Sequence, residues 1–155
     1  MAQPPHFYLD KAVYLITTAT INRTKLFKDP QIAQLLVDSL QQGEEKWGYK
    51  LYAYVIMPDH IHVIIEPLKG KNLSRIMNQI KGASSRKINS ILKQSGRLWQ
   101  KGFHDFTIYG EKKFREKFNY VHYNPVKWSI VEHAEDYPFS SAKYYKNMCN
   151  AVYYE

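Results

Sequence analysis

The amino-acid sequence predicts an α+β fold in which an antiparallel sheet carries helices packed mainly on one face. Short runs rich in β-branched and aromatic residues alternate along the chain with longer segments whose apolar residues recur at helical spacing. Two of the short runs are separated only by Pro58 and Asp59, which indicates a hairpin of antiparallel strands. The 155 residues contain no internal repeat, low-complexity tract or linker, so we expect a single domain spanning residues 1–155.

Four segments have strand character. Residues 11–23 form the first, and residues 49–57 form the second. The third runs from His60 to Glu66 and is bounded by proline on both sides. Residues 97–109 are the fourth, with Gly102 as a candidate bulge.

Three helices are expected, two of them between these strands and the third after the last strand. The first covers residues 30–47, with Asp29 as its cap, and Gly48 ends it. The second begins after Asn72, a plausible cap, and its apolar residues continue at helical spacing to Leu92.

The second helix has a weak point at residues 82–85 (Gly-Ala-Ser-Ser), where it can bend or split. The third helix covers residues 111–124 and is expected to stop or kink at Pro125. An antiparallel sheet of the ferredoxin-like kind accommodates this order of strands and helices.

The charge distribution points to a polyanionic partner. The formal net charge is +8, and residues 69–117 contain thirteen basic but three acidic residues, an excess of ten positive charges. Trp99, Phe103, Phe106 and Tyr109 interleave with these cations, a composition that binds phosphates and stacks unpaired bases. Nucleic acid is therefore the first candidate and an anionic membrane the second, although such a segment can also be a solvated face above an aromatic core.

Other classes are disfavoured. Cys149 is the one cysteine of the sequence, so there is no disulfide framework and no thiolate metal cluster. No apolar run approaches the length of a membrane span, and Met1–Pro5 lacks the basic-then-apolar pattern of a signal peptide. We expect a cytoplasmic protein with no membrane partner.

Two histidines lie on the third predicted strand. Side chains alternate across a strand, so His60, His62, Ile64 and Glu66 share one face. A strand presents two nitrogen ligands to one metal ion in this way. Taken alone, the pair fits equally well two polar residues on a half-exposed face.

The third helix carries a second candidate group. Phe114, Phe118 and Val121 make its apolar stripe, whereas Tyr120 and Asn124 stack one turn apart on another side, with Lys113 and Lys117 beside them. A phenol, an amide oxygen and two ammonium groups suit a tyrosine that attacks a phosphodiester with the help of a cation. Locally, the same residues also fit a tyrosine at the edge of the core and an asparagine that caps a turn begun by proline.

Three motifs together are more specific than any one of them. They are MPDHIHV at residues 57–63, LWQKGF at residues 98–103 and YVHYNPVK at residues 120–127, accompanied by TTATINR at residues 17–23 and YPFSS at residues 137–141. In these motifs and their order the chain resembles the HUH single-strand transposases, and among them the REP-associated tyrosine transposases. The resemblance runs from about Tyr14 to Tyr145.

The resemblance implies a ferredoxin-like domain that cuts and rejoins single-stranded DNA beside a hairpin. It implies that His60 and His62 hold Mg²⁺ or Mn²⁺ and that Tyr120 attacks the phosphate, giving a 5′-phosphotyrosine link and a free 3′-OH. Asn124 stands where related enzymes carry a glutamine as the third ligand. The implied partner is a DNA hairpin in the bacterial cytoplasm or nucleoid, and the protein is a monomer or homodimer. Six cations are expected to contact nucleic acid: Arg23, Lys81, Arg86, Arg97, Lys113 and Lys117.

Three alternatives remain. A non-cutting hairpin-binding protein would have no chemical reason to keep His60, His62 and Tyr120 together. A rolling-circle replication initiator is disfavoured by the short chain. A metal-free RNA-binding module would need exposed aromatic residues on central strands, such as Tyr52 and Tyr54.

Overall fold

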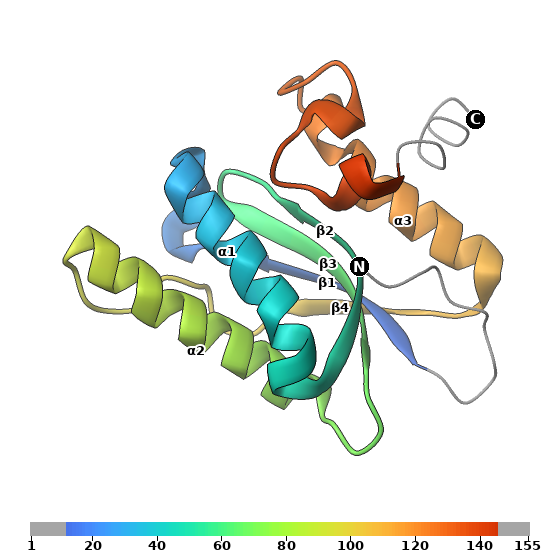
Figure 1. The fold of residues 1–155 in the computed structure, drawn as a ribbon, viewed down its shortest axis with the longest axis horizontal. Coiled ribbons are helices and arrows are strands. Elements are labelled where there is room, and N and C mark those ends of the chain that lie inside the picture. Colours follow the sequence, from blue (N-terminus) through green and yellow to red (C-terminus); the bar gives the residue numbers. More distant parts are fainter. Residues whose placement is uncertain (1–11, 146–155) are drawn as a thin grey trace.

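The computed structural model describes residues 12–145, and Lys11 and Cys149 lie outside this range. Within it, four strands form one antiparallel sheet in the order β2-β3-β1-β4 (Figure 1). The strands are β1 (Val13–Ala19), β2 (Tyr49–Ile56), β3 (His60–Pro67) and β4 (His104–Ile108). Strands β2 and β3 form the hairpin that the sequence predicts around Pro58 and Asp59.

Three long helices cover the sheet. They are α1 (Pro30–Gly43), α2 (Leu73–Leu92) and α3 (Gly110–Lys127). Helices α1 and α2 lie side by side on one face, and α3 lies on the other (Figure 1). The predicted α+β class is confirmed, with two of the three helices on one face, and α3 stands on the face that carries the histidines.

The sheet separates two hydrophobic cores. Ile61, Val63 and Ile65 of β3 pack against α1 and α2, whereas Ile64 faces α3. This is the alternation that the sequence predicts for the strand of the histidines. None of the helices in residues 12–145 combines the length and the apolar character needed to cross a membrane.

The first strand and the first helix end earlier than predicted. Strand β1 stops at Ala19, and a 3₁₀ turn (Ile21–Arg23) follows, closed by a hydrogen bond from Thr20 Oγ1 to the carbonyl of Thr24. Helix α1 starts at Pro30, and the Asp29 carboxylate accepts from the N–H of Gln31 at 2.9 Å, as its cap role requires. The helix widens into a π-type turn (Glu44–Gly48) before β2.

Helix α2 is continuous, so the predicted bend or split at residues 82–85 is wrong. The small residues there serve packing: Ala83 and Ser84 are buried, and Ser84 Oγ accepts from the indole N–H of Trp99 at 3.0 Å. The cap is as predicted, because the Asn72 side chain accepts from the N–H of Arg75 at 3.1 Å.

The fourth strand is shorter than the predicted residues 97–109. Trp99 makes only an isolated bridge to Thr20, and Gly102 lies in a turn with a φ of +74° rather than in a bulge. The Lys81 ammonium group donates to the carbonyls of Gln100 and Gly102, at 2.8 and 2.6 Å. These bonds satisfy backbone groups that a strand partner would otherwise take, so the segment folds as a loop.

Helix α3 runs through Pro125 to Lys127, so of the two outcomes predicted at Pro125, a stop or a kink, the stop is wrong. Proline has no N–H and removes one helical hydrogen bond. The loss falls in the last turn, where Trp128 N–H bonds to the carbonyl of Asn124 at 3.1 Å and closes the helix.

Candidate active site

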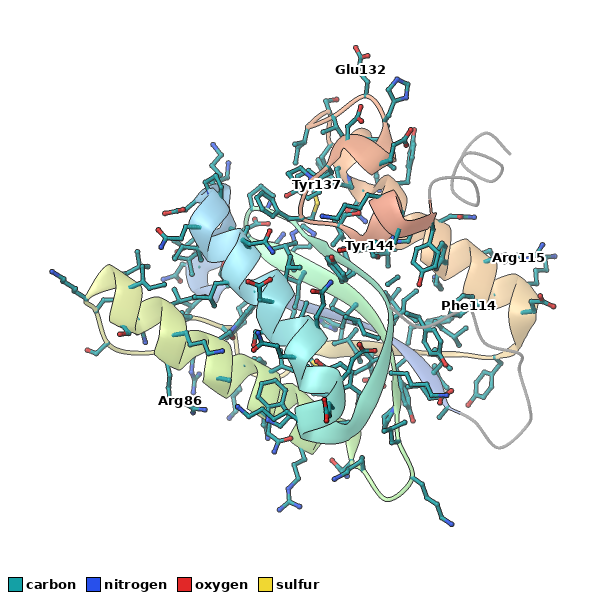
Figure 2. All side chains as sticks on the ribbon, viewed as in Figure 1. Arg86, Phe114, Arg115, Glu132, Tyr137 and Tyr144 are labelled. Carbon is teal, nitrogen blue, oxygen red and sulfur yellow. The ribbon has the colours of Figure 1, made fainter. Side chains whose placement is uncertain are left out.

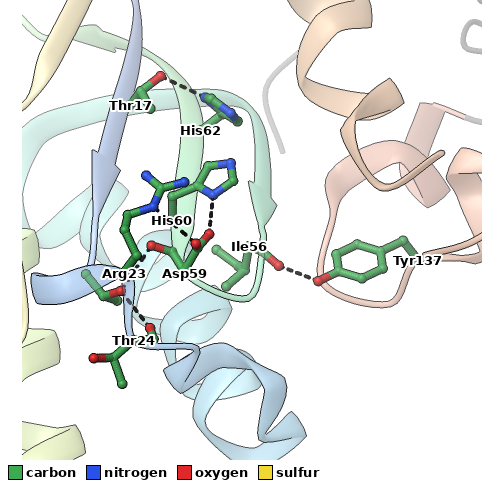
Figure 3. A network of polar contacts seen from close by, with 9 residues as sticks. Thr17, Arg23, Thr24, Ile56, Asp59, His60, His62 and Tyr137 are labelled. Atoms are coloured by element: carbon green, nitrogen blue, oxygen red, sulfur yellow. Dashed lines mark hydrogen bonds and ion pairs between the residues drawn. The ribbon is translucent and has the colours of Figure 1, made fainter. Parts of the chain in front are cut away.

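Two imidazole rings lie together on the α3 face of the sheet. The rings of His60 and His62 have centroids 4.9 Å apart and an interplanar angle of 82°. Each ring is held through its Nδ1 atom (Figure 3). Thr17 Oγ1 lies 2.7 Å from Nδ1 of His62, and Oδ1 of Asp59 lies 2.7 Å from Nδ1 of His60.

Because the Nδ1 atom of each ring makes one of these contacts, Nε2 is the ring nitrogen that is left for a ligand. A carboxylate only accepts, so Nδ1 of His60 carries the proton and donates to Asp59. A neutral His60 ring then presents a lone pair at Nε2. The contact of His62 Nδ1 with the Thr17 hydroxyl allows the same tautomer. An imidazole whose other nitrogen bonds to a protein oxygen is the usual state of a metal-binding histidine.

The electrostatics favour the uncharged form of His62. Burial, followed by the electrostatic effects of the neighbouring His60 and Arg23, lowers the pKa of His62 to about 3. A neutral ring is the form that binds a metal ion. Two imidazoles with free Nε2 atoms therefore fit a divalent cation in their chemistry, and His60 and His62 are the side chains that would hold it.

Asp59 links this pair to a cation. Arg23 Nε donates to Oδ2 of Asp59 at 3.1 Å, while Oδ1 accepts from His60. Partial burial acts to raise the pKa of Asp59, but the contacts with His60 and Arg23 outweigh it and lower that pKa. The carboxylate is therefore charged at neutral pH and orients both partners.

Tyr120 of α3 reaches the same place. Its ring lies edge-on to that of His62, with centroids 5.2 Å apart and planes at 70°. Tyr120 is 44% exposed, so the residue lies at the protein surface. The ammonium group of Lys117 lies 5.9 Å from the centroid of the Tyr120 ring. The structure thus brings His60, His62, Tyr120 and Lys117 together from two separate elements.

Asn124 is more buried than the sequence predicts. The sequence pattern predicts it off the buried side of the helix, yet only 3% of it is exposed. Its Nδ2 atom donates to the carbonyl of Tyr120 at 3.0 Å, and the side-chain oxygen keeps its capacity to accept. The rotation of about 40° between the two positions is enough to turn Asn124 toward the sheet while Tyr120 stays at the surface.

His122 anchors the tyrosine helix. It is fully buried, and its Nε2 lies 2.6 Å from Oγ of Ser141. Ser141 Oγ also accepts from the N–H of Tyr54 on β2 at 2.9 Å. No contact was predicted from the sequence for Thr17, Asp59 or Ser141, although each lies within one of the motifs at residues 17–23, 57–63 and 137–141.

The residues that were predicted to contact nucleic acid do not all lie on the same face of the sheet. Arg23 and Lys117 lie beside the imidazoles and Tyr120, and Lys113 is paired with Glu116 at 2.7 Å. Lys81 and Arg86 belong to α2, on the opposite face of the sheet from α3 (Figure 2). Arg97 is exposed in the loop that follows α2.

Acidic and thiol side chains can also serve as metal ligands. Among residues 12–145, no group of three or more His, Cys, Asp and Glu side chains is arranged to hold a metal ion. Within these residues, amide and hydroxyl oxygens are the protein groups left as candidates to complete a metal site on the two imidazoles.

Comparison with known proteins agrees with this fold and motif set. The family model described as "Transposase IS200 like" matches residues 9–124, and the chain belongs to this family. It is 24% identical over 154 residues to the REP-associated tyrosine transposase of Escherichia coli K12, covering 99% of this chain and 88% of that protein. It is 27% identical over 139 residues to a Haemophilus influenzae protein provisionally named a REP-associated tyrosine transposase, covering 83% and 78% of the two chains.

A solved structure shares the fold. It is that of a REP-associated tyrosine transposase bound to a REP hairpin, with a TM-score of 0.73 and 23% identity, covering 99% of this chain and 88% of that one. The resemblance predicted from the sequence motifs is thereby confirmed at the level of family and fold.

Proposed function

We propose that this protein is a metal-dependent transposase that cleaves and rejoins single-stranded DNA beside hairpin sequences. The observation that carries the proposal is the contact between the Tyr120 ring and the ring of His62, whose Nδ1 is held by Thr17. A nucleophile beside two oriented imidazoles is the minimum that the reaction needs. The family and the named relatives support the same chemistry.

In the proposed reaction, Tyr120 Oη attacks the phosphorus of a phosphodiester. A P–O bond forms to the tyrosine, and the P–O bond to the 3′-oxygen breaks, which leaves a 5′-phosphotyrosine link and a 3′-OH. The phenol loses its proton, and the leaving 3′-oxygen gains one. Attack by another 3′-OH reverses these steps and joins strands without external energy.

His60 and His62 are the proposed ligands of a divalent cation, Mg²⁺ or Mn²⁺, which when bound polarises the scissile phosphate. Asn124 remains the proposed third ligand, through the side-chain oxygen that its bond to Tyr120 leaves free. Arg23 and Lys117 are placed to attract the phosphates.

Hairpin DNA is the proposed substrate because the named relatives are REP-associated transposases and the related structure is bound to a REP hairpin. His62 and Tyr120 come from one chain, so a monomer can hold a complete site. The metal-free RNA-binding alternative loses its support, because Tyr52 and Tyr54 are buried. The non-cutting hairpin-binding protein is the alternative that an experiment must separate.

The test is covalent capture. The wild type is mixed with Mn²⁺ and a labelled library of DNA hairpins with randomised single-stranded flanks, and products are separated on a denaturing gel. We expect a slowly migrating protein–DNA adduct that disappears in Tyr120→Phe and with a chelator, and sequencing of the captured DNA gives the cleavage site. Binding without any adduct would favour the non-cutting protein, and an adduct that survives Tyr120→Phe would point to half-exposed Tyr123.

A further inference from the structure

Strand β4 lies at one edge of the sheet and exposes an aromatic ring. Phe106 is 42% exposed, and its neighbours His104 and Asp105 are exposed as well. A single exposed aromatic residue is ordinary on a protein surface, so its surroundings decide whether it matters.

The register of the sheet places Phe106 on the active-site face. Phe106 lies opposite Leu15, His104 lies opposite Thr17, and Thr17 lies opposite His62. Residues directly opposite one another in an antiparallel sheet project from the same face. With strands spaced about 4.8 Å apart, β4 is about 10 Å from β3. A nucleotide that adjoins a phosphate at the imidazoles can span that distance.

Lys117 connects the exposed ring to the proposed nucleophile. Its ammonium group lies 4.4 Å from the centroid of Phe106 and 5.9 Å from that of Tyr120. Among the ion pairs of residues 12–145, none includes Lys117, whereas Lys113 one turn earlier is paired with Glu116. A cation–π contact at an exposed site is weak, so this ammonium can exchange the ring for a phosphate.

The other aromatic residues of the basic segment are placed differently. Trp99 is buried and donates to Ser84, Phe103 is partly buried against the core of α1 and α2, and Tyr109 lies beyond the end of β4 at the start of α3. Phe106 is therefore the ring of this segment that is both exposed and on the histidine face.

From this arrangement we infer that Phe106 and Lys117 form a nucleotide subsite beside the proposed reaction centre. A base flanking the scissile phosphate stacks on Phe106, and Lys117 binds the adjoining phosphate. Every base has a face that can stack, so the subsite positions the strand without reading its sequence. The inference rests on the proposed function, since it assumes single-stranded DNA at Tyr120.

Photocrosslinking tests the stacking directly. The DNA captured by the wild type is resynthesised with 5-iododeoxyuridine at each of the two nucleotides that flank the scissile phosphate, and it is irradiated with the Tyr120→Phe protein, which forms no phosphotyrosine. We expect a crosslink from one of the two positions that peptide mass spectrometry maps to Phe106. A crosslink that maps elsewhere, or no crosslink from either position, overturns the subsite.

Steady-state cleavage with matched variants gives the second readout. Phe106→Leu should raise KM by about tenfold, Phe106→Trp should restore it, and Lys117→Gln should raise it as well. Tyr109→Leu and Lys46→Gln are controls, because Tyr109 is exposed beyond β4 and Lys46 lies over Trp47 at 5.5 Å, away from the site. Unchanged cleavage in Phe106→Leu, while the wild type cleaves, contradicts the subsite alone; a wild type that forms no adduct contradicts the proposed function instead.

Discussion

Thr17 on β1 and His62 on β3 are paired in register, and the hydroxyl of Thr17 lies 2.7 Å from Nδ1 of His62. This contact leaves Nε2 as the nitrogen that can bind a metal ion. A similar contact between Asp59 and His60 orients the second ring. If the pair binds a metal ion as we propose, its binding depends on two neighbours that are not themselves proposed ligands.

Thr17→Val keeps the shape of the side chain and removes the hydroxyl. We expect Mn²⁺ affinity to fall about 10- to 100-fold, because the His62 ring loses the partner that fixes its orientation. Thr17→Ser should stay close to the wild type. The measurement is a Mn²⁺ titration followed by electron paramagnetic resonance, and equal affinity in the valine variant and the wild type would refute the role.

The choice of metal ion follows from the ligand set. Two imidazole nitrogens suit Mn²⁺ better than Mg²⁺, which prefers oxygen ligands. We expect Mn²⁺ to support half-maximal adduct formation at a lower concentration than Mg²⁺. Titration of each ion in the capture reaction measures this, and a lower half-maximal concentration for Mg²⁺ would argue against a site with two imidazole ligands.

Lys81 is expected to hold a loop. Its ammonium group donates to the carbonyls of Gln100 and Gly102, and burial followed by the charge of Arg97 lowers its pKa. Lys81→Met should lower the free energy of unfolding by about 1–2 kcal/mol, measured by urea denaturation.

The salt dependence of DNA affinity distinguishes the loop-holding role of Lys81 from a role in DNA binding. Lys117→Gln should reduce the slope of log affinity against log salt by about 0.7, the value for one phosphate contact on single-stranded DNA, whereas Lys81→Met should leave the slope unchanged. An equal change of slope in both variants would show that Lys81 also binds a phosphate.

Because the hydroxyl of Tyr137 is buried, we expect the protein to lose folding stability at alkaline pH. The Tyr137 hydroxyl donates to the carbonyl of Ile56, and burial raises its pKa to about 12 (Figure 3). An unfolded tyrosine ionises near pH 10, so the stabilisation is complete below about pH 10 and is lost as the pH rises through about 12. At pH 11 the loss from this one group is on the order of 1 kcal/mol.

Tyr137→Phe isolates that contribution, because the other tyrosines are common to both proteins. At pH 8 the variant should be less stable by about 1–2 kcal/mol, since it lacks the hydrogen bond. At pH 11 the difference should shrink by about 1 kcal/mol in urea unfolding. A difference that does not vary with pH would mean that Tyr137 does not titrate in this way.

The sequence correctly predicted the helix starts that are set by a neighbouring capping residue. Asp29 and Asn72 start α1 and α2 as expected, and the alternation of β3 correctly put His60 and His62 on one face. The motif-based resemblance supplied the family, which no single one of these signals could give.

Features that depend on distant parts of the chain were not predictable. The run of small residues at 82–85 gives the signal of a helix break, yet Ala83 and Ser84 are buried and Ser84 accepts a hydrogen bond from the distant Trp99. The Lys81 contacts require the loop at residues 100–102 to be placed first. The burial of Asn124 likewise depends on how α3 rotates over the sheet.

We propose that Tyr120, beside His62, becomes covalently linked to DNA. The most direct measurement digests the captured adduct with protease and nuclease and locates the nucleotide remnant by mass spectrometry. We expect a remnant on Tyr120 in the wild type and in Tyr123→Phe, and none in Tyr120→Phe. A remnant on Tyr123 or on any other residue would contradict it.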